Sequence, residues 1–186
     1  RTLGPPAVEG LLAWQKMHNA AGALPESAKV TSVNRFFNQR IRFIDDIVVW
    51  GQADYWATPM ETLYKGAGDC EDYAIAKYFT LLALGIPPAR LRLTYVRAAM
   101  NREGEVSFIP HMVLAYYPQP GKEPLVLDNL IESIQPASAR ADGCCRRRHP
   151  AASGRHPGSR RRSGRRPSPY RRSGRQSQRR QCRRRV

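Results

Sequence analysis

The stretch GAGDCEDYAI, residues 66–75, joins a glycine-rich turn, a cysteine and the start of a helix. The spacing of apolar residues that follows predicts a helix over 69–84. Asp69 is a favoured residue type for an N-cap, and Gly85 fits the position just after the last helical turn. Cys70 is therefore expected in the first turn, where unpaired backbone N–H groups and the positive end of the helix dipole lower a thiol pKa.

Three carboxylates surround this cysteine in the sequence, at Asp69, Glu71 and Asp72. Their negative charge opposes a thiolate and so acts against the helix dipole. Asp72 also fits a position like that of a capping box, and acidic residues at a helix start are common for capping alone. Either Cys70 is a small buried residue without a chemical role, or a cation cancels the charge. Clustered carboxylates suit Ca²⁺, although three are too few for a whole coordination shell.

Two further helices are predicted upstream, over 7–20 and 26–43, because apolar residues recur there at roughly helical spacing. Pro25 and the residues after it form a plausible helix start. The residues of the three helices that are expected to face the core are Leu11, Leu12, Trp14, Val30, Val33, Phe36, Phe37, Ile75, Phe79 and Leu82.

Strand-like runs follow the cysteine helix, at 91–99, 111–117 and 124–129. Turn-rich connectors separate them, NREGE at 101–105 and PQPGKE at 118–123. Helices followed by antiparallel strands predict an α+β fold, with N-terminal helices packed on an antiparallel sheet.

The last two runs bring a histidine and a carboxylate to one hairpin. His111 begins one run and Asp128 lies near the end of the next. If the turn centres between Gln119 and Pro120, the two residues face each other with Cβ atoms about 5 Å apart. The carboxylate could then accept the imidazole N–H and fix its tautomer. The plainer alternatives are a hydrogen-bonded core histidine and an aspartate that ends a strand or starts a turn.

The three residues together predict acyl-transfer chemistry. Cys70 is the candidate nucleophile, His111 the base and Asp128 the group that orients the base. The backbone N–H of Cys70 is a candidate oxyanion donor. Trp56 could add a further oxyanion contact, but packing is the more common role of a large aromatic residue.

Charge divides the chain of 186 residues into two parts. All 15 acidic residues lie within 1–142, together with 14 of the 31 Lys and Arg, whereas the other 17 Arg lie within 143–186. The net charge of +16 therefore describes the C-terminal segment. We expect one domain over 1–142 and a disordered tail over 143–186, where few apolar residues are available to form a core. No apolar run approaches the roughly 20 residues of a membrane span, so no membrane insertion is expected.

The composition changes abruptly after SIQPASARAD, residues 133–142. Arg, Gly, Pro, Ala and Ser have GC-rich codons, so our hypothesis is that a frameshift replaced the native C-terminus. A phosphate-binding arm is the alternative, because Arg-rich segments bind polyanions without specificity. Apart from Tyr170, the segment lacks the aromatic residues on which bases stack, so no specific nucleic-acid partner is expected.

Three blocks of the sequence resemble the bacterial transglutaminase-like cysteine proteinases, whose best-known members are the LapG-type periplasmic proteases. They are GDCEDYAIAKYFTLLALGI (68–86), HMVLAYY (111–117) and LVLDNL (125–130). The resemblance covers roughly residues 10–142. Members of the family continue in ordered sequence at the point where this chain becomes Arg-rich.

The resemblance implies a papain/transglutaminase-like α+β fold with a Cys–His–Asp triad and a Ca²⁺ site. The residues so implied are Cys70, His111 and Asp128 for the triad and Asp69, Glu71 and Asp72 for Ca²⁺.

The resemblance also implies a function: a calcium-dependent periplasmic endopeptidase that cuts the N-terminal region of a large surface adhesin at a di-alanine site and so controls biofilm release. It further implies a partner, an inner-membrane cyclic-di-GMP receptor that sequesters the protease. A transglutaminase or deamidase with the same triad, and a non-catalytic protein-binding module of the same fold, remain alternatives.

Overall fold

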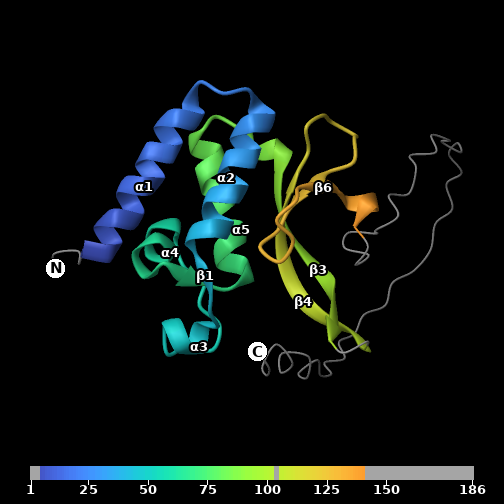
Figure 1. Cartoon of the computed structure of the whole chain (residues 1–186). Coiled ribbons are helices and arrows are strands. Elements are labelled where there is room, and N and C mark those ends of the chain that lie inside the picture. The colour runs from blue at the N-terminus through green and yellow to red at the C-terminus, as the bar shows by residue number, and fades with distance from the viewer. Residues whose placement is uncertain (1–4, 103–104, 141–186) are drawn as a thin grey trace, which may run out of the picture. The chain divides into compact units, whose positions relative to one another are not determined.

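The structure of the protein is a computed structural model that describes residues 5–102 and 105–140. Helices come first in the chain and the main sheet follows, as the sequence predicts (Figure 1). The helices are α1 (Pro5–Gly22), α2 (Glu26–Arg40), α3 (Asp46–Val49), α4 (Pro59–Lys65) and α5 (Cys70–Ala83), with short 3₁₀ turns at Pro88–Arg90 and Ala137–Ala139. The strands are β1 (Arg42–Phe43), β2 (Ala67–Gly68), β3 (Leu91–Arg102), β4 (Glu105–Tyr116), β5 (Leu125–Leu127) and β6 (Gln135–Pro136). The tail predicted over 143–186 lies outside the described residues.

Helix α5 lies at the centre of the domain. It packs against α2 and α4 and also against β3 and β4, so it stands between the other helices and the sheet (Figure 1). Val33 and Phe37 from α2, Leu81 from α5, Leu114 from β4 and Leu127 from β5 are almost completely buried in the same cluster. The start of α5 is therefore held by a core that joins helices to sheet.

Two predicted details of the helices are wrong. The second helix ends at Arg40 instead of continuing to residue 43, because Arg42 and Phe43 pair in parallel with β2. Leu12 and Phe79, both expected in the core, are 59% and 52% exposed. For Phe79 the reason is that α5 packs against other elements on several sides, so its buried residues do not follow a single apolar stripe.

Local signals at α4 explain how the chain is led to Cys70. Thr58 and Glu61 form a capping box: the Glu61 N–H donates to Thr58 Oγ1, and the Thr58 N–H donates to Glu61 Oε2 at 2.8 Å. Pro59 occupies the first helical position, and Gly66 ends the helix with φ at +59°. The short strand β2 then leads directly to Asp69 and Cys70.

The main sheet is antiparallel with the order β3-β4-β5-β6. The hairpin of β4 and β5 is present, but its predicted register is wrong by two residues: Leu114 pairs with Leu127 and not with Leu125. A shift by an even number keeps each side chain on the same face of the sheet. His111 and Asp128 therefore remain on a common face, although they are diagonal rather than direct neighbours.

Every helix in the described part of the chain is too short or too polar to serve as a membrane span.

Candidate active site

Cys70 is the first residue of α5, as the sequence predicts, with Asp69 at the N-cap in an extended conformation. The Asp69 side chain makes no cap hydrogen bond. The Cys70 thiol donates to Glu71 Oε2 at 3.1 Å. Burial raises the pKa of this thiol far above its usual value, and the charge of Glu71 raises it further, while the backbone N–H of Met112 acts in the opposite direction. Cys70 is therefore a protonated thiol in this arrangement.

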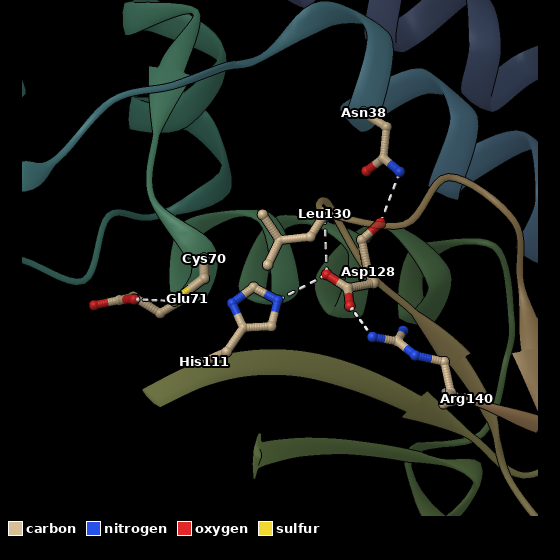
Figure 2. Close-up of polar contacts among 7 residues, drawn as sticks. All are labelled: Asn38, Cys70, Glu71, His111, Asp128, Leu130 and Arg140. Carbon is tan, nitrogen blue, oxygen red and sulfur yellow. Dashed lines mark hydrogen bonds and ion pairs between the residues drawn. The ribbon is translucent and has the colours of Figure 1, made fainter. Parts of the chain in front are cut away.

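His111 and Asp128 form a buried pair. The distance from His111 Nε2 to Asp128 Oδ1 is 2.7 Å, and both side chains are almost inaccessible to solvent. A bond to a carboxylate requires the proton on Nε2, which leaves Nδ1 of the neutral ring free to accept a proton. Figure 2 shows this second nitrogen on the side of the ring away from Asp128.

Asp128 has further partners that the sequence analysis did not predict. The Leu130 N–H donates to Oδ1 at 2.9 Å, and Arg140 Nη2 donates to Oδ2 at 2.7 Å (Figure 2). Asn38 Nδ2 donates to the Asp128 backbone carbonyl at 2.7 Å. Burial alone would raise the pKa of Asp128, but the donors from His111, Leu130 and Arg140 lower it to about 2. The carboxylate is thus ionised and fixed by both of its oxygens.

The thiol and the imidazole lie on neighbouring elements without a hydrogen bond between them. The Met112 backbone N–H faces the Cys70 thiol, and Met112 directly follows His111 on β4. Within residues 5–102 and 105–140, the thiol's side-chain hydrogen bond is to Glu71 and not to His111. The structure therefore brings the three predicted residues to one place, with His111 and Asp128 in contact and Cys70 turned to a carboxylate.

The acidic cluster is larger than predicted. Asp46 of α3 and Asp54 of the following loop join Asp69, Glu71 and Asp72 beside the cysteine. Carboxylate oxygens of Asp46, Asp69 and Asp72 lie within 4.8 Å of one another. Those of Asp46, Asp54 and Glu71 do so as well. Asp46 belongs to both groups, so the segment between β1 and α4, which contains α3 and the loop after it, contributes directly to the cluster.

Two of these carboxylates use one oxygen each to hold that loop. Asp46 Oδ2 accepts from the Tyr55 N–H at 2.6 Å, and Asp72 Oδ1 accepts from the Ala57 N–H at 2.8 Å. The Asp72 carboxylate thus holds the loop and also faces the Asp69 backbone N–H, as its capping-box-like position predicts. Asp46 Oδ1, Asp72 Oδ2 and Asp69 Oδ1 are buried and have no hydrogen-bond donor within the described residues.

These unpartnered oxygens fit a hard cation. Burial raises the pKa of Asp46, Asp69 and Asp72, that of Asp72 to about 7, and the negative charge of the neighbouring carboxylates raises these pKa values further. Gly68 leaves room for the cluster, since a Cβ there would lie 2.5 Å from Asp72 Oδ2. Oxygen ligands of this number and charge are those that Ca²⁺ takes in proteins. The residues present are therefore suited to Ca²⁺.

Several residues of the site were missed because their sequence signals are weak or absent. Asp46 lies in an acidic pair with Asp45 inside a stretch of mixed character, and that pair is the one available hint. Arg140 follows no periodic pattern. Trp56 is half exposed, and its indole N–H donates to Asp54 Oδ1 at 3.1 Å, so it contacts a residue of the acidic cluster.

Comparison with known proteins supports one family. The sequence profile of the bacterial transglutaminase-like cysteine proteinases (BTLCP) matches residues 14–152. The calcium-bound structure of LapG from Legionella pneumophila is 39% identical, with a TM-score of 0.64 over 75% of this chain and 73% of that one. The EGTA-treated form of the same protein matches with the same identity and TM-score over 75% of this chain and 71% of that one. No match is found among curated proteins.

The family profile spans most of the described helices and the main sheet, and the structural match covers 75% of the chain. A mixed helical and antiparallel architecture with the cysteine at a helix start is the transglutaminase-like fold. The chain therefore belongs to the bacterial transglutaminase-like cysteine proteinase family.

Proposed function

We propose that the protein is a calcium-dependent cysteine endopeptidase with Cys70 as nucleophile. One observation carries the proposal. The buried carboxylate of Asp128 holds His111 Nε2 at 2.7 Å, and the next residue on the strand, Met112, has its backbone N–H facing the Cys70 thiol. An oriented imidazole beside a thiol at a helix start is the arrangement that nucleophilic acyl transfer requires.

The proposed reaction uses each residue in turn. His111 Nδ1 accepts the thiol proton, and Cys70 Sγ bonds to the scissile carbonyl carbon while the carbonyl electrons move to oxygen. The Cys70 backbone N–H donates to that oxyanion. His111 then delivers the proton to the leaving amine, the C–N bond breaks and a thioester remains. Water, deprotonated by the same imidazole, then attacks the thioester carbon, the C–S bond breaks to release the carboxylic acid product, and His111 returns the proton to Cys70 Sγ. Asp128 stabilises the imidazolium in both halves.

Calcium has a defined place in this proposal. Asp46, Asp69, Glu71 and Asp72 would hold it, with Asp54 at the exposed side of the cluster. Bound Ca²⁺ would neutralise the charge that now raises the pKa of the thiol. Glu71 would then be drawn away from Cys70, and the thiol proton would be available to His111.

We further propose the substrate, compartment and partner by resemblance to LapG-type proteases. The substrate is the N-terminal region of a large surface adhesin, cut at a di-alanine site in the periplasm with release of cells from biofilm. The regulator is an inner-membrane cyclic-di-GMP receptor that sequesters the protease. Family membership and the 39% identity to a LapG support this assignment.

The first test is cleavage of an adhesin segment that contains Ala-Ala. The full chain should yield two fragments, and Cys70→Ala should lower the rate about 1,000-fold or more. Cys182→Ala removes a cysteine far away in the sequence and should cleave normally. Undiminished cleavage by Cys70→Ala would contradict the mechanism. An isopeptide product or released ammonia, in place of two fragments, would indicate a transglutaminase or deamidase.

The second test concerns the cation. Chelation with EGTA should lower activity, and added Ca²⁺ should raise the thermal midpoint of the full chain. Asp46→Asn should reduce this midpoint shift, because it removes one charge and keeps an acceptor for the Tyr55 N–H. Asp45→Asn, on the exposed neighbour, is the matched control and should leave the shift intact. Equal shifts in the two variants would contradict the assigned ligand set.

A further inference from the structure

In β4 the backbone N–H and C=O groups of the even-numbered residues point away from β3. Just beyond the paired residues, the Tyr117 N–H donates to the Arg90 carbonyl at 2.8 Å. This bond indicates that the backbone N–H and C=O groups of the odd-numbered residues of β4 point toward β3. Hydrogen-bonding direction alternates along a strand, so the even-numbered residues face the opposite edge. Pro110 agrees with this assignment, because a proline nitrogen has no hydrogen to offer to a partner strand and faces an open edge.

Strand β5 covers only the end of that opposite edge. The Ala137 N–H donates to the Pro124 carbonyl at 3.0 Å, so the backbone groups of the even-numbered residues of β5 point toward β6 and those of the odd-numbered residues point toward β4. The odd-numbered Leu125 and Leu127 pair with Tyr116 and Leu114 of β4, which are even-numbered as this direction requires. The pairing stops at Leu114, so the rest of this edge of β4 receives no strand of the described chain.

The uncovered part of the edge is exposed and carries unused backbone groups. Residues 105–110 are all exposed, with Val106 60% and Phe108 53% accessible. Within the described residues, no hydrogen bond engages the outward N–H and C=O groups of Val106 and Phe108 or the carbonyl of Pro110. These groups present alternating acceptors and donors over a length of several residues.

The candidate nucleophile stands at the end of this open edge. Met112 is even-numbered, and its outward N–H faces the Cys70 thiol. Figure 2 shows Cys70 at the start of α5, near the strand from which His111 rises. Moving along β4 away from β5, the edge therefore presents first Cys70 beside Met112 and then the free groups of Pro110, Phe108 and Val106.

We propose that this open edge, at Val106, Phe108 and Pro110, binds the extended backbone of the substrate as an added strand and leads its scissile bond to Cys70. The occupant is an unfolded polypeptide segment, because the groups on offer are main-chain donors and acceptors in strand spacing that end at a thiol. The inference rests on the proposed peptidase function. It also explains how a protease can accept small residues such as alanine at the cut: main-chain bonds hold the substrate whatever its side chains.

The test measures binding apart from cleavage. A short fluorescent peptide with a central Ala-Ala is titrated into the otherwise intact Cys70→Ala protein, and its anisotropy gives Kd. Phe108→Pro deletes one outward N–H and, like the native Pro110, leaves the bonds to β3 in place. Phe108→Ala is the matched control, since it removes the same ring, together with its contact to Arg97, but keeps the N–H. Phe108→Pro should bind about 3- to 10-fold more weakly than Phe108→Ala, as expected for one lost hydrogen bond.

A second measurement leaves the protein unchanged. Peptides N-methylated at one backbone position each should lose affinity at alternate residues on one side of the Ala-Ala pair, because strand pairing engages every second residue. Equal losses at all positions, or equal Kd values for the two Phe108 variants, would overturn the inference. No binding by Phe108→Ala would overturn it as well, while the cleavage test of the proposed function stands separately. A change of oligomeric state in Phe108→Pro without a change in peptide binding would assign the edge to a second copy of the chain.

Discussion

At the residue scale, Asp128 both stabilises the fold and orients the proposed base. Its two oxygens receive hydrogen bonds from His111, Leu130 and Arg140, and its side chain is fully buried. A buried charge is tolerated only while its partners are present, because it has lost its hydration. The same contacts that orient the imidazole thus keep the C-terminal part of the domain in place.

Arg140 should therefore matter more than an ordinary surface arginine. Arg140→Gln leaves Asp128 without its cation and should lower the free energy of unfolding by about 3–5 kcal/mol, measured by urea denaturation. Arg90→Gln is the control, since Arg90 pairs with Glu26 at 2.5 Å with both side chains about one third exposed. That change should cost at most about 1 kcal/mol. Equal costs would show that the Arg140–Asp128 pair does not stabilise the fold.

At the scale of elements, α5 carries polar groups where a simple amphipathic helix would be apolar. Asp72, Lys77 and Thr80 are buried together with Ala76 and Leu81. Lys77 is 1% exposed, and its ammonium lies 5.6 Å from the centre of the Tyr73 ring. Burial lowers the pKa of Lys77 to about 7, although the charge of Asp128 acts in the opposite direction.

Lys77→Met should stabilise the protein, and the gain should depend on pH. Below about pH 7 Lys77 is charged in both states, so the folded state bears the full cost of its desolvation. Between about pH 7 and 10.5 the unfolded chain holds a proton that the folded state has released, so the wild-type stability rises with pH. The gain should thus be about 1–4 kcal/mol near pH 6 and clearly smaller at about pH 9.5.

Urea denaturation at both pH values measures this gain. Lys122→Met, at an exposed position, is the control and should change stability by less than about 0.5 kcal/mol at either pH. A loss of stability in Lys77→Met near pH 6 would instead show that Asp128 needs Lys77 as a second cation besides Arg140.

Periodicity in the sequence predicted much of this arrangement but not all of it. The α5 start, the strand at His111 and the strand before Asp128 follow from local patterns. The predicted hairpin register was wrong by two residues, an even number, so His111 and Asp128 were still placed on the same face of the sheet and close together. Asp46 and Arg140 come from irregular segments that only the tertiary fold brings to the site, so no local pattern announces them.

At the scale of the whole molecule, charge separates the domain from the Arg-rich segment. Residues 1–142 contain every acidic residue, whereas 143–186 contain 17 Arg. Deleting 143–186 should abolish binding to heparin or nucleic acid at low salt, because the remaining chain is nearly neutral. Alkylation of Cys70 by iodoacetamide should proceed at an unchanged rate, since the deletion retains Arg140. Polyanion binding that survives the deletion would place a basic surface on the domain itself.

The position of Arg140 has a consequence for biosynthesis. Cys70, His111 and Asp128 all precede this arginine in the sequence, so they are synthesised before it. A nascent domain that closed over Asp128 earlier would enclose a carboxylate without its guanidinium, an arrangement that favours reopening. The Arg140–Asp128 pair thus makes durable closure of the domain depend on a residue that is synthesised after Cys70, His111 and Asp128.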